Sequence, residues 1–422
     1  MKTALMLTGL AAALLCLPGA SAAAQKAFKP DHLFVGDAPS RVVEFDEEGE
    51  FVKVLDEDTL AMAFGPDGLL YVANLQGIRA LDADGHASKT FGEGDIPPGT
   101  LAGMCFATGG ELCLIDNGVE NRLLRFSVTQ QDLVASPEVP STVLSPLTLA
   151  PDGRLLGALA ADVNGLPSHI LQLLEFDVPD GQVSPPPEVL AQVACSVTFG
   201  PDGNQYFVQE SGSQVSVRTP GGSDIALIGI DADLELPRDL RFGPDGHLYI
   251  ASFGSGLVEV IDTTGAHVAT IGADAPLDGP TRLAFSPRRF HAKLSGKSVG
   301  ATGASVNLKA DAVVSFTPGQ ATLMLLVEND LADQDDFASL YGGTLVFSGH
   351  QAAGEDPKTR RLAVACMSNV PLQAGFGVAD LTLKGKLDEG GRFVPAKASG
   401  SFLRAAAGHV FTGKLSTGKL IK

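Results

Sequence analysis

One short motif returns along the chain and limits its fold more than any other feature. Phe-Gly-Pro-Asp-Gly begins at Phe64, Phe199 and Phe242, a variant begins at Leu149, and a weaker copy begins at Phe106. Pro sets φ at the first turn position, Asp bonds back to the backbone, and Gly takes the left-handed position. The motif therefore predicts a tight turn between two antiparallel strands.

Each copy of the motif belongs to a unit of four short strand patterns, which is clearest at 237–272. A repeat of roughly 40–45 residues with four strands per unit is typical of a β-propeller. A last first-strand pattern, Thr281 to Phe285, has no partners after it, whereas His32 to Leu55 supplies three strands without a first. We therefore predict an all-β chain with a six-bladed β-propeller, closed by a C-terminal first strand that completes blade one.

The repeat also carries a family resemblance. Its Phe-Gly-Pro-Asp-Gly-x-Leu-Tyr-Val-Ala run and the Asp-x-x-Gly turn that follows, as in Leu70 to Gly85, resemble the NHL family of β-propellers over about residues 32–287. The match to the senescence marker protein-30/gluconolactonase family is looser. That second resemblance implies Ca²⁺ at the channel mouth of a lactonase. Two of that family's ligands are missing here, since 27–37 lacks the early Glu and the Pro-Asn-Gly strand start reads Pro237-Arg238-Asp239.

The first 24 residues have the pattern of a secretion signal. Lys2 precedes an apolar run from Leu5 to Leu17, and small residues follow it. We expect cleavage to leave a mature end between Ala23 and Gln25, and export of the chain to the periplasm or the outside of the cell. The sequence has no other apolar run long enough to span a bilayer.

Charge divides the remaining chain into two parts. Residues 25–287 carry a net charge of −25 and residues 288–422 a net charge of +5. The acidic part disfavours nucleic acid as a partner. The repeat stops at the same boundary, and Gly-punctuated strand patterns take its place. We therefore expect a propeller at 25–287 and, at 288–422, a β-rich domain of unknown family that forms a small antiparallel β-sandwich or barrel.

Propeller topology predicts where a ligand binds. The loops between second and third strands and the linkers between blades share one face, and an insertion at 160–169 belongs to it, while the Gly-Pro-Asp-Gly turns occupy the other face. Loops on a rigid scaffold commonly carry sites. The predicted ligand-binding residues at this channel mouth are Asp37, Asn74, Asp116, Asp162, Glu210, Arg238 and Arg282.

Two classes of function fit this pattern. We favour a binding scaffold, expected to be a monomer, that holds a protein or a small molecule at the channel mouth. The alternative is a calcium-dependent lactonase or esterase, for which Ca²⁺ is the cofactor. No residue is assigned a catalytic role and no metal ligand is assigned. The sequence does not decide between enzyme and scaffold.

The cysteines allow two interpretations. Cys105 and Cys113 lie on strands predicted to pair, so an oxidising compartment would permit a disulfide between them. The favoured interpretation is that these two, together with Cys195 and Cys366, are small buried apolar side chains. No Cys-x-x-Cys pair is present to support a zinc or redox site.

Overall fold

The structure, a computed structural model, consists of β-strands without helices in the part of the chain that it describes. That part is residues 26–421, apart from short turns and longer stretches at 140–145, 169–175, 184–193, 329–342 and 366–373. For most of 296–419 it describes the strand backbones rather than the side chains. The predicted secretion signal, residues 1–24, lies outside the described residues.

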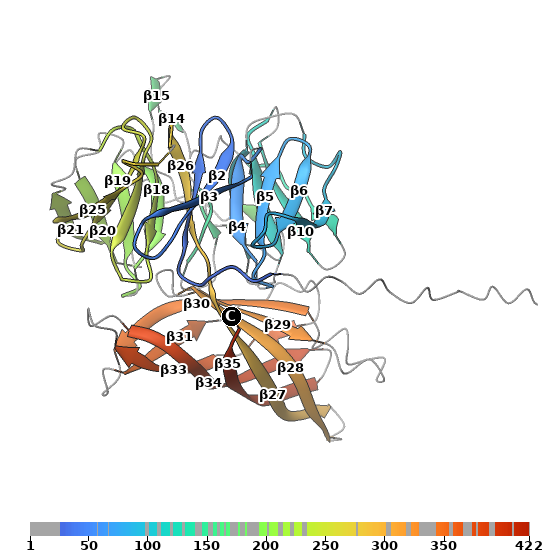
Figure 1. Cartoon of the computed structure of the whole chain (residues 1–422). Helices are drawn as coiled ribbons and strands as arrows, with labels where there is room; N and C mark the ends of the chain where they lie inside the picture. The colour runs from blue at the N-terminus through green and yellow to red at the C-terminus, as the bar shows by residue number, and fades with distance from the viewer. Residues whose placement is uncertain are drawn as a thin grey trace, which may run out of the picture.

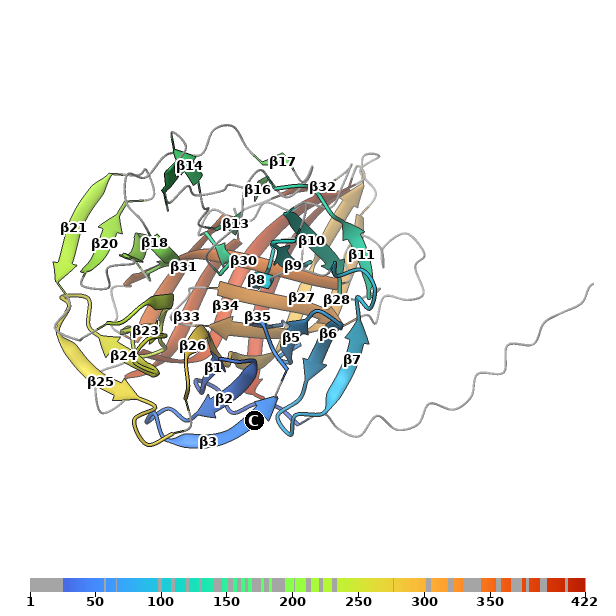
Figure 2. The same ribbon diagram turned by 90° about the horizontal axis from the view of Figure 1, so that it is seen from above.

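The chain forms six four-stranded antiparallel sheets, which we number sheets 1 to 6 along the chain. Figure 2 shows them arranged in a ring, and we call the axis of this ring the channel. Sheet 1 has the order β26-β1-β2-β3 and sheet 4 the order β12-β13-β16-β17, and the other four sheets each contain consecutive strands. The strands of sheets 1 to 3 are β1 (Leu33–Asp37), β2 (Arg41–Phe45), β3 (Phe51–Asp56), β4 (Ala61–Phe64), β5 (Leu70–Asn74), β6 (Gly77–Leu81), β7 (Ala87–Phe91), β8 (Leu101–Phe106), β9 (Leu112–Asp116), β10 (Arg122–Ser127) and β11 (Asp132–Ala135), with β26 (Pro280–Phe285). Those of sheets 4 to 6 are β12 (Thr148–Leu149), β13 (Leu155–Leu156), β16 (Phe176–Asp177), β17 (Gln182–Val183), β18 (Ala194–Phe199), β19 (Gln205–Gln209), β20 (Gln214–Arg218), β21 (Asp224–Gly229), β22 (Pro237–Phe242), β23 (Leu248–Ser252), β24 (Leu257–Ile261) and β25 (His267–Ile271).

The propeller arrangement is confirmed, but the number of regular blades is five rather than the predicted six. Sheets 1, 2, 3, 5 and 6 are regular blades. Sheet 4 has strands of two residues, and β13 pairs with β16 through the single register pair Leu155↔Phe176. So short a ladder contributes few backbone hydrogen bonds. The predicted insertion supplies the hairpin β14 (Ala161–Val163) and β15 (Leu166–Ser168), on the face away from the second half of the chain (Figure 1).

The ends of the propeller close as the sequence predicted. Strand β26 pairs antiparallel with β1, with Phe285 opposite Leu33 and Leu283 opposite Val35. The ring therefore joins residues about 250 positions apart in the chain, and the inner edge of β1 is paired rather than open to another chain.

The Gly-Pro-Asp-Gly turns also have the predicted chemistry. In the turn before β23, Asp245 Oδ1 accepts the backbone N–H of His247 at 3.1 Å, while Asp245 Oδ2 accepts the Tyr249 hydroxyl at 3.0 Å. Gly246 has a φ of 82°, in the left-handed region that favours glycine. The turn is thus fastened both to its own backbone and to the strand after it.

That tyrosine also joins neighbouring sheets. The Tyr249 ring meets Phe285 of sheet 1 edge to face, with ring centroids 4.9 Å apart. Tyr206 meets Phe242 in the same way at 4.8 Å, and Tyr71 meets Phe106 at 5.3 Å. The Phe of the motif in one sheet therefore packs on the Tyr of the sheet before it, and this contact repeats around the ring.

The chain passes from β26 into a second sheet after only two residues. Its strands are β27 (Arg288–Gly300), β28 (Ser305–Thr317), β29 (Thr322–Glu328), β30 (Gly343–Ala353), β31 (Thr359–Ala365), β32 (Ala374–Phe376), β33 (Ala379–Leu387), β34 (Phe393–Ala406) and β35 (His409–Leu420). Strand β35 pairs with both β27 and β34, which closes the sheet on itself. Of the two predicted forms, the strand pairing is therefore that of a barrel.

The closed sheet lies against the face of the propeller that carries the Gly-Pro-Asp-Gly turns (Figure 1). Arg288 forms an ion pair with Asp31, and Thr317 at the end of β28 lines a cavity together with first-strand residues of the propeller. That the two parts fold independently stays a prediction.

Cys105 and Cys113 are free thiols. The two are directly opposite in the register of β8 and β9, and the shift in that register lies towards the other end of β8, between Leu101 and Gly103. Burial raises the pKa of the Cys105 thiol to about 12 and raises that of Cys113 well above its usual value. The interpretation as buried apolar side chains fits both.

Candidate functional site

The predicted channel mouth carries polar side chains where second strands end. Asp37 is one of them, and its side chain is fully buried. Its carboxylate accepts the backbone N–H groups of Asp278 and Gly279, at 3.1 and 2.7 Å, and pairs with Arg41 at 2.7 Å. These contacts hold the linker between sheets 6 and 1, so the oxygens of Asp37 are already used by the fold.

Asn74 has a comparable structural role. Its Oδ1 accepts the backbone N–H groups of Gln76 and Gly77, at 2.8 and 3.1 Å, and its Nδ2 donates to Asp58. An Asn or Asp at this point of a turn is favoured by such bonds alone. The geometry therefore explains Asn74 without a ligand.

Asp116 differs from these two residues. It is buried at the end of β9, and its Oδ1 forms no hydrogen bond within the described residues. Removal from water raises the pKa of this carboxyl, although a backbone hydrogen bond from Gly118 and the charge of Arg122 act in the opposite direction. A buried carboxyl with a raised pKa and an oxygen without a hydrogen-bond donor among the described residues is the kind of group that ligand sites often contain.

The other four predicted residues are Arg238, Arg282, Asp162 and Glu210. Arg238 is exposed and stands over the Phe253 ring, 5.3 Å from its centroid. Arg282 points into the channel and donates to the carbonyl of Ala102 in sheet 3. Asp162 is in the β14–β15 hairpin, and its side chain is outside what the structure describes, as is the whole of Glu210. The mouth as a ligand site stays a prediction.

The sequence analysis missed the charged residues inside the channel. Asp239 is fully buried in β22, where it accepts the Ser196 hydroxyl at 3.0 Å and the Leu283 backbone N–H at 2.9 Å. Arg241, two residues later, reaches the Thr148 hydroxyl at 2.9 Å. The available signal was the pair of charges in PRDLRF, a strand that must be buried on both faces.

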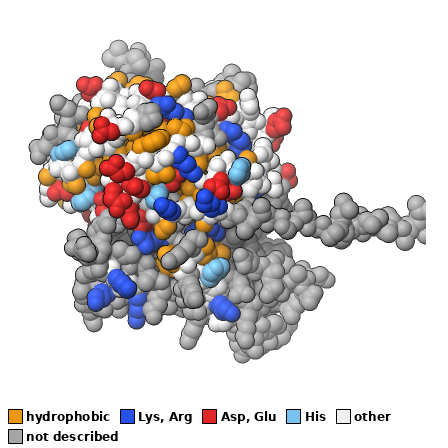
Figure 3. Space-filling view, in the orientation of Figure 1, with side chains coloured by type: hydrophobic (Ala, Val, Ile, Leu, Met, Phe, Trp, Pro, Cys, Tyr) orange, Lys and Arg blue, Asp and Glu red, His pale blue; other side chains and the backbone are white. Residues whose placement is uncertain are grey.

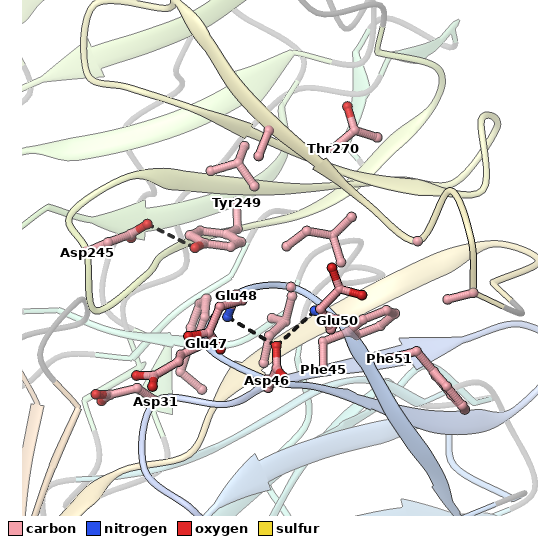
Figure 4. A pocket seen from close by; sticks show the side chains of 18 of the residues that line it. Asp31, Phe45, Asp46, Glu47, Glu48, Glu50, Phe51, Asp245, Tyr249 and Thr270 are labelled. Atoms are coloured by element: carbon pink, nitrogen blue, oxygen red, sulfur yellow. Dashed lines mark hydrogen bonds between the residues drawn. The ribbon is translucent and has the colours of Figure 1, made fainter. Parts of the chain in front are cut away.

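The second site that the sequence did not predict is a groove of about 630 Å³ between sheets 1 and 6, drawn in Figure 4. We call it the blade groove. Its walls include the apolar or aromatic side chains of Phe45, Tyr249, Val260, Ile271 and Phe285. Its acidic lining residues are Asp31, Asp46, Glu47, Glu48, Glu50, Asp245 and Asp274.

Acidic side chains also gather in Figure 3 on the part of the propeller nearest the closed sheet, at the level of β3 and β25. Glu47, Glu48 and Glu50 of the groove are exposed to solvent. A concave surface of this volume, with an apolar floor and acidic edges, has the size and composition of a ligand site.

The turn that carries these glutamates can be compared with two others of the same geometry. Asp46 Oδ1 accepts two backbone N–H groups, those of Glu48 at 3.1 Å and Glu50 at 2.9 Å. Asp82 and Asp262 form the same two bonds in sheets 2 and 6. The two residues after the Asp are Glu-Glu in sheet 1, Ala-Asp in sheet 2 and Thr-Thr in sheet 6. The turn therefore does not require the glutamates.

Among the residues that the structure describes, no three His, Cys, Asp or Glu side chains come together in a way that could hold a metal ion. The described residues also contain no helix that is long and apolar enough to cross a membrane.

Solved structures that are similar to this chain include a protein of unknown function from Bacteroides caccae, with a TM-score of 0.49 and 15% identity, covering 61% of this chain and 99% of that one. A streptogramin B lyase has a TM-score of 0.39 and 14% identity, covering 87% and 96%. Regucalcin from Agrobacterium tumefaciens, described as a calcium-binding protein, has a TM-score of 0.41 and 16% identity, covering 68% and 89%. No protein-family model and no curated protein matches the chain.

Proposed function

We propose that this chain is an exported binding scaffold and that its ligand is a basic, partly apolar segment of another protein, held in the blade groove. The propeller fold supports a scaffold, because it presents side chains on a rigid ring of sheets. The secretion signal supports export. The sequence predicted a ligand at the channel mouth, whereas we propose the blade groove. The side-chain oxygens of Asp37 and Asn74 at the mouth already accept backbone N–H groups.

The observation that carries the proposal is the choice of side chains in the β2–β3 turn. Glu47 and Glu48 occupy positions where equivalent turns have Thr-Thr or Ala-Asp, so backbone geometry does not account for them. They stand beside a groove whose lining includes Tyr249 and the exposed ring of Phe51. Clustered carboxylates repel one another, and this cost is offset when a cationic ligand binds.

The test uses the mature chain and two labelled peptides, Lys-Leu-Lys-Leu-Lys and its acidic counterpart Glu-Leu-Glu-Leu-Glu. We expect the basic peptide to bind saturably and more weakly as salt is added, and the acidic peptide not to bind. Glu48→Thr should weaken binding about two- to fivefold, the effect of one exposed charge pair, and Glu47→Thr with Glu48→Thr should weaken it further.

The matched control is Asp84→Thr. Asp84 occupies the position of Glu48 in the equivalent turn of sheet 2, so the substitution removes the same charge at a site away from the groove. It should leave peptide binding unchanged. Equal weakening by both substitutions, or binding of both peptides alike, would contradict the proposal. Added Ca²⁺ with a panel of lactones and esters tests the hydrolase alternative in the same samples, because only that alternative expects turnover.

A further inference from the structure

Two arginines cross the propeller channel. Arg241 of sheet 6 donates to the Thr148 hydroxyl at 2.9 Å and to the Leu147 carbonyl at 3.4 Å, beyond the neighbouring sheet 5. Arg282 of sheet 1 donates to the carbonyl of Ala102 in sheet 3, beyond sheet 2. Two guanidinium groups from the neighbouring sheets 6 and 1 therefore reach across the ring, to sheets 4 and 3.

The acidic groups described inside the channel do not balance these cations. Asp239 is the carboxylate between them, and it lies 3.4 Å from Arg241 Nε. Burial lowers the pKa of the Arg282 guanidinium to about 10; the charge of Asp239 raises this pKa, whereas the charges of Arg241 and Arg238 lower it further. Among the channel residues that the structure describes, these two cations and one anion leave an excess positive charge, in a protein whose net charge is −19. A buried charge without compensation is costly.

Hydrogen bonding shows the same deficit. The Nε–H groups of Arg241 and Arg282 form no hydrogen bond to any residue that the structure describes. Arg241 is only 8% exposed. Most buried donors in folded proteins have a partner, so two donors without one require an explanation, and an ion that the protein binds is one.

A cavity lies beside Arg241. Its volume is about 80 Å³, and at roughly 30 Å³ for each water molecule it has room for a few species of that size. Besides Arg241, its polar lining includes the hydroxyls of Thr198 and Thr317, and its apolar lining includes Phe199 and Phe285. None of the described lining residues is acidic. Apolar walls strengthen the attraction between a cation and an anion, because they exclude water.

We propose that this cavity binds a small monovalent anion, a halide or a formate-sized carboxylate, against the Arg241 guanidinium. The anion adds negative charge to this cluster and accepts a hydrogen bond from Arg241 Nε–H, which forms an ion pair with Asp239 but no hydrogen bond within the described residues. The residues around the cavity come from several propeller sheets and from β28 of the closed sheet. An anion bound here would therefore stabilise the contacts among these strands. The site shares the Phe285 wall with the blade groove, but it has its own lining residues and does not depend on the proposed function.

The test is thermal unfolding of the mature chain at constant ionic strength, with sodium gluconate replaced stepwise by chloride, bromide or formate. Constant ionic strength removes the general screening of the acidic surface. We expect the melting temperature to rise saturably with each small anion, as for a ligand that binds the folded state alone. Arg241→Gln should weaken the apparent affinity about tenfold or more, the loss of a charged hydrogen bond.

Lys26→Gln is the control, since it removes the same charge from an exposed pair with Asp84 and should keep the full anion dependence. Anomalous diffraction from bromide-soaked wild-type crystals gives a second readout that does not depend on a variant folding, and bromide should lie beside Arg241. Equal melting in gluconate and in the small anions, an Arg241→Gln chain that keeps the dependence, or a cavity without bromide would each overturn the proposal.

Discussion

Replacement of Asp239 by Ala tests how the ring is held together at its centre. The carboxylate is fully buried and accepts hydrogen bonds from Ser196 at 3.0 Å and from the backbone of Leu283 at 2.9 Å, so it joins sheets 5, 6 and 1. It also compensates the charge of Arg241, 3.4 Å away. Removing one member of a buried ion pair typically costs about 3–5 kcal/mol, because the partner is left as an uncompensated buried charge.

We therefore expect Asp239→Ala to lower the free energy of unfolding by about 3–5 kcal/mol, which is a large part of the roughly 5–15 kcal/mol of a typical protein. Urea unfolding followed by circular dichroism measures it. Asp239→Asn keeps the shape and one acceptor, so its loss should be smaller. Asp239→Ala removes a negative charge and so makes the channel more positive. The melting temperature of this variant should therefore depend more steeply on chloride concentration than that of the wild type.

Asp262→Ala is the control, since Asp262 forms its hydrogen bonds with N–H groups of an exposed turn. It should be far less destabilising. An Asp239→Ala chain no less stable than Asp262→Ala would refute the reasoning, because it would mean that neither the hydrogen bonds to Ser196 and Leu283 nor the charge matters in the channel.

Three further predictions follow from burial and from the sequence. Asp116→Asn should be more stable than the wild type at pH 7, because the raised pKa of Asp116 means that folding disfavours its ionised form. This gain in stability should vanish as the pH falls through 3.8, the ordinary pKa of Asp, below which the carboxyl is protonated in both states. Urea titrations at a series of pH values measure the difference. Cys105 and Cys113 should resist iodoacetamide in the folded chain at pH 8 and react on unfolding, as mass spectrometry would show, since burial raises both thiol pKa values and excludes the reagent. Exported protein should begin between Ala23 and Gln25, and a mass that retains the apolar run before it would contradict the predicted signal.

The propeller could be predicted because its information is local and repeated. The turn bonds of Asp245, the left-handed Gly246 and the unmatched strand at Phe285 each depend on a few neighbouring residues. The short strands of sheet 4 were not predicted, because the spacing of the repeat indicates that a unit is present but does not indicate the length of its strands. Strand patterns likewise predicted β-structure after Pro287, whereas closure of the sheet depends on pairing between strands far apart, such as β27 with β35.

The sites were harder to predict than the fold. Asn74 has the residue type of a ligand, but the same type is needed to cap a turn, and sequence alone does not separate the two uses. The blade groove combines the β2–β3 turn with residues near Ile271, more than 200 positions later. A local sequence pattern therefore cannot predict it. The contacts of Asp239 and Arg241 are made with the first strands of other sheets, so these contacts exist only once the ring has formed.

The most direct test of the binding proposal is a crystal structure of the mature chain with the Lys-Leu-Lys-Leu-Lys peptide. The account predicts that the peptide lies in the blade groove, with lysine ammonium groups near Glu47 and Glu48 and leucine side chains against Phe51 and Tyr249. A peptide seated instead at the channel mouth beside Asp116, with the groove free of it, would contradict the account.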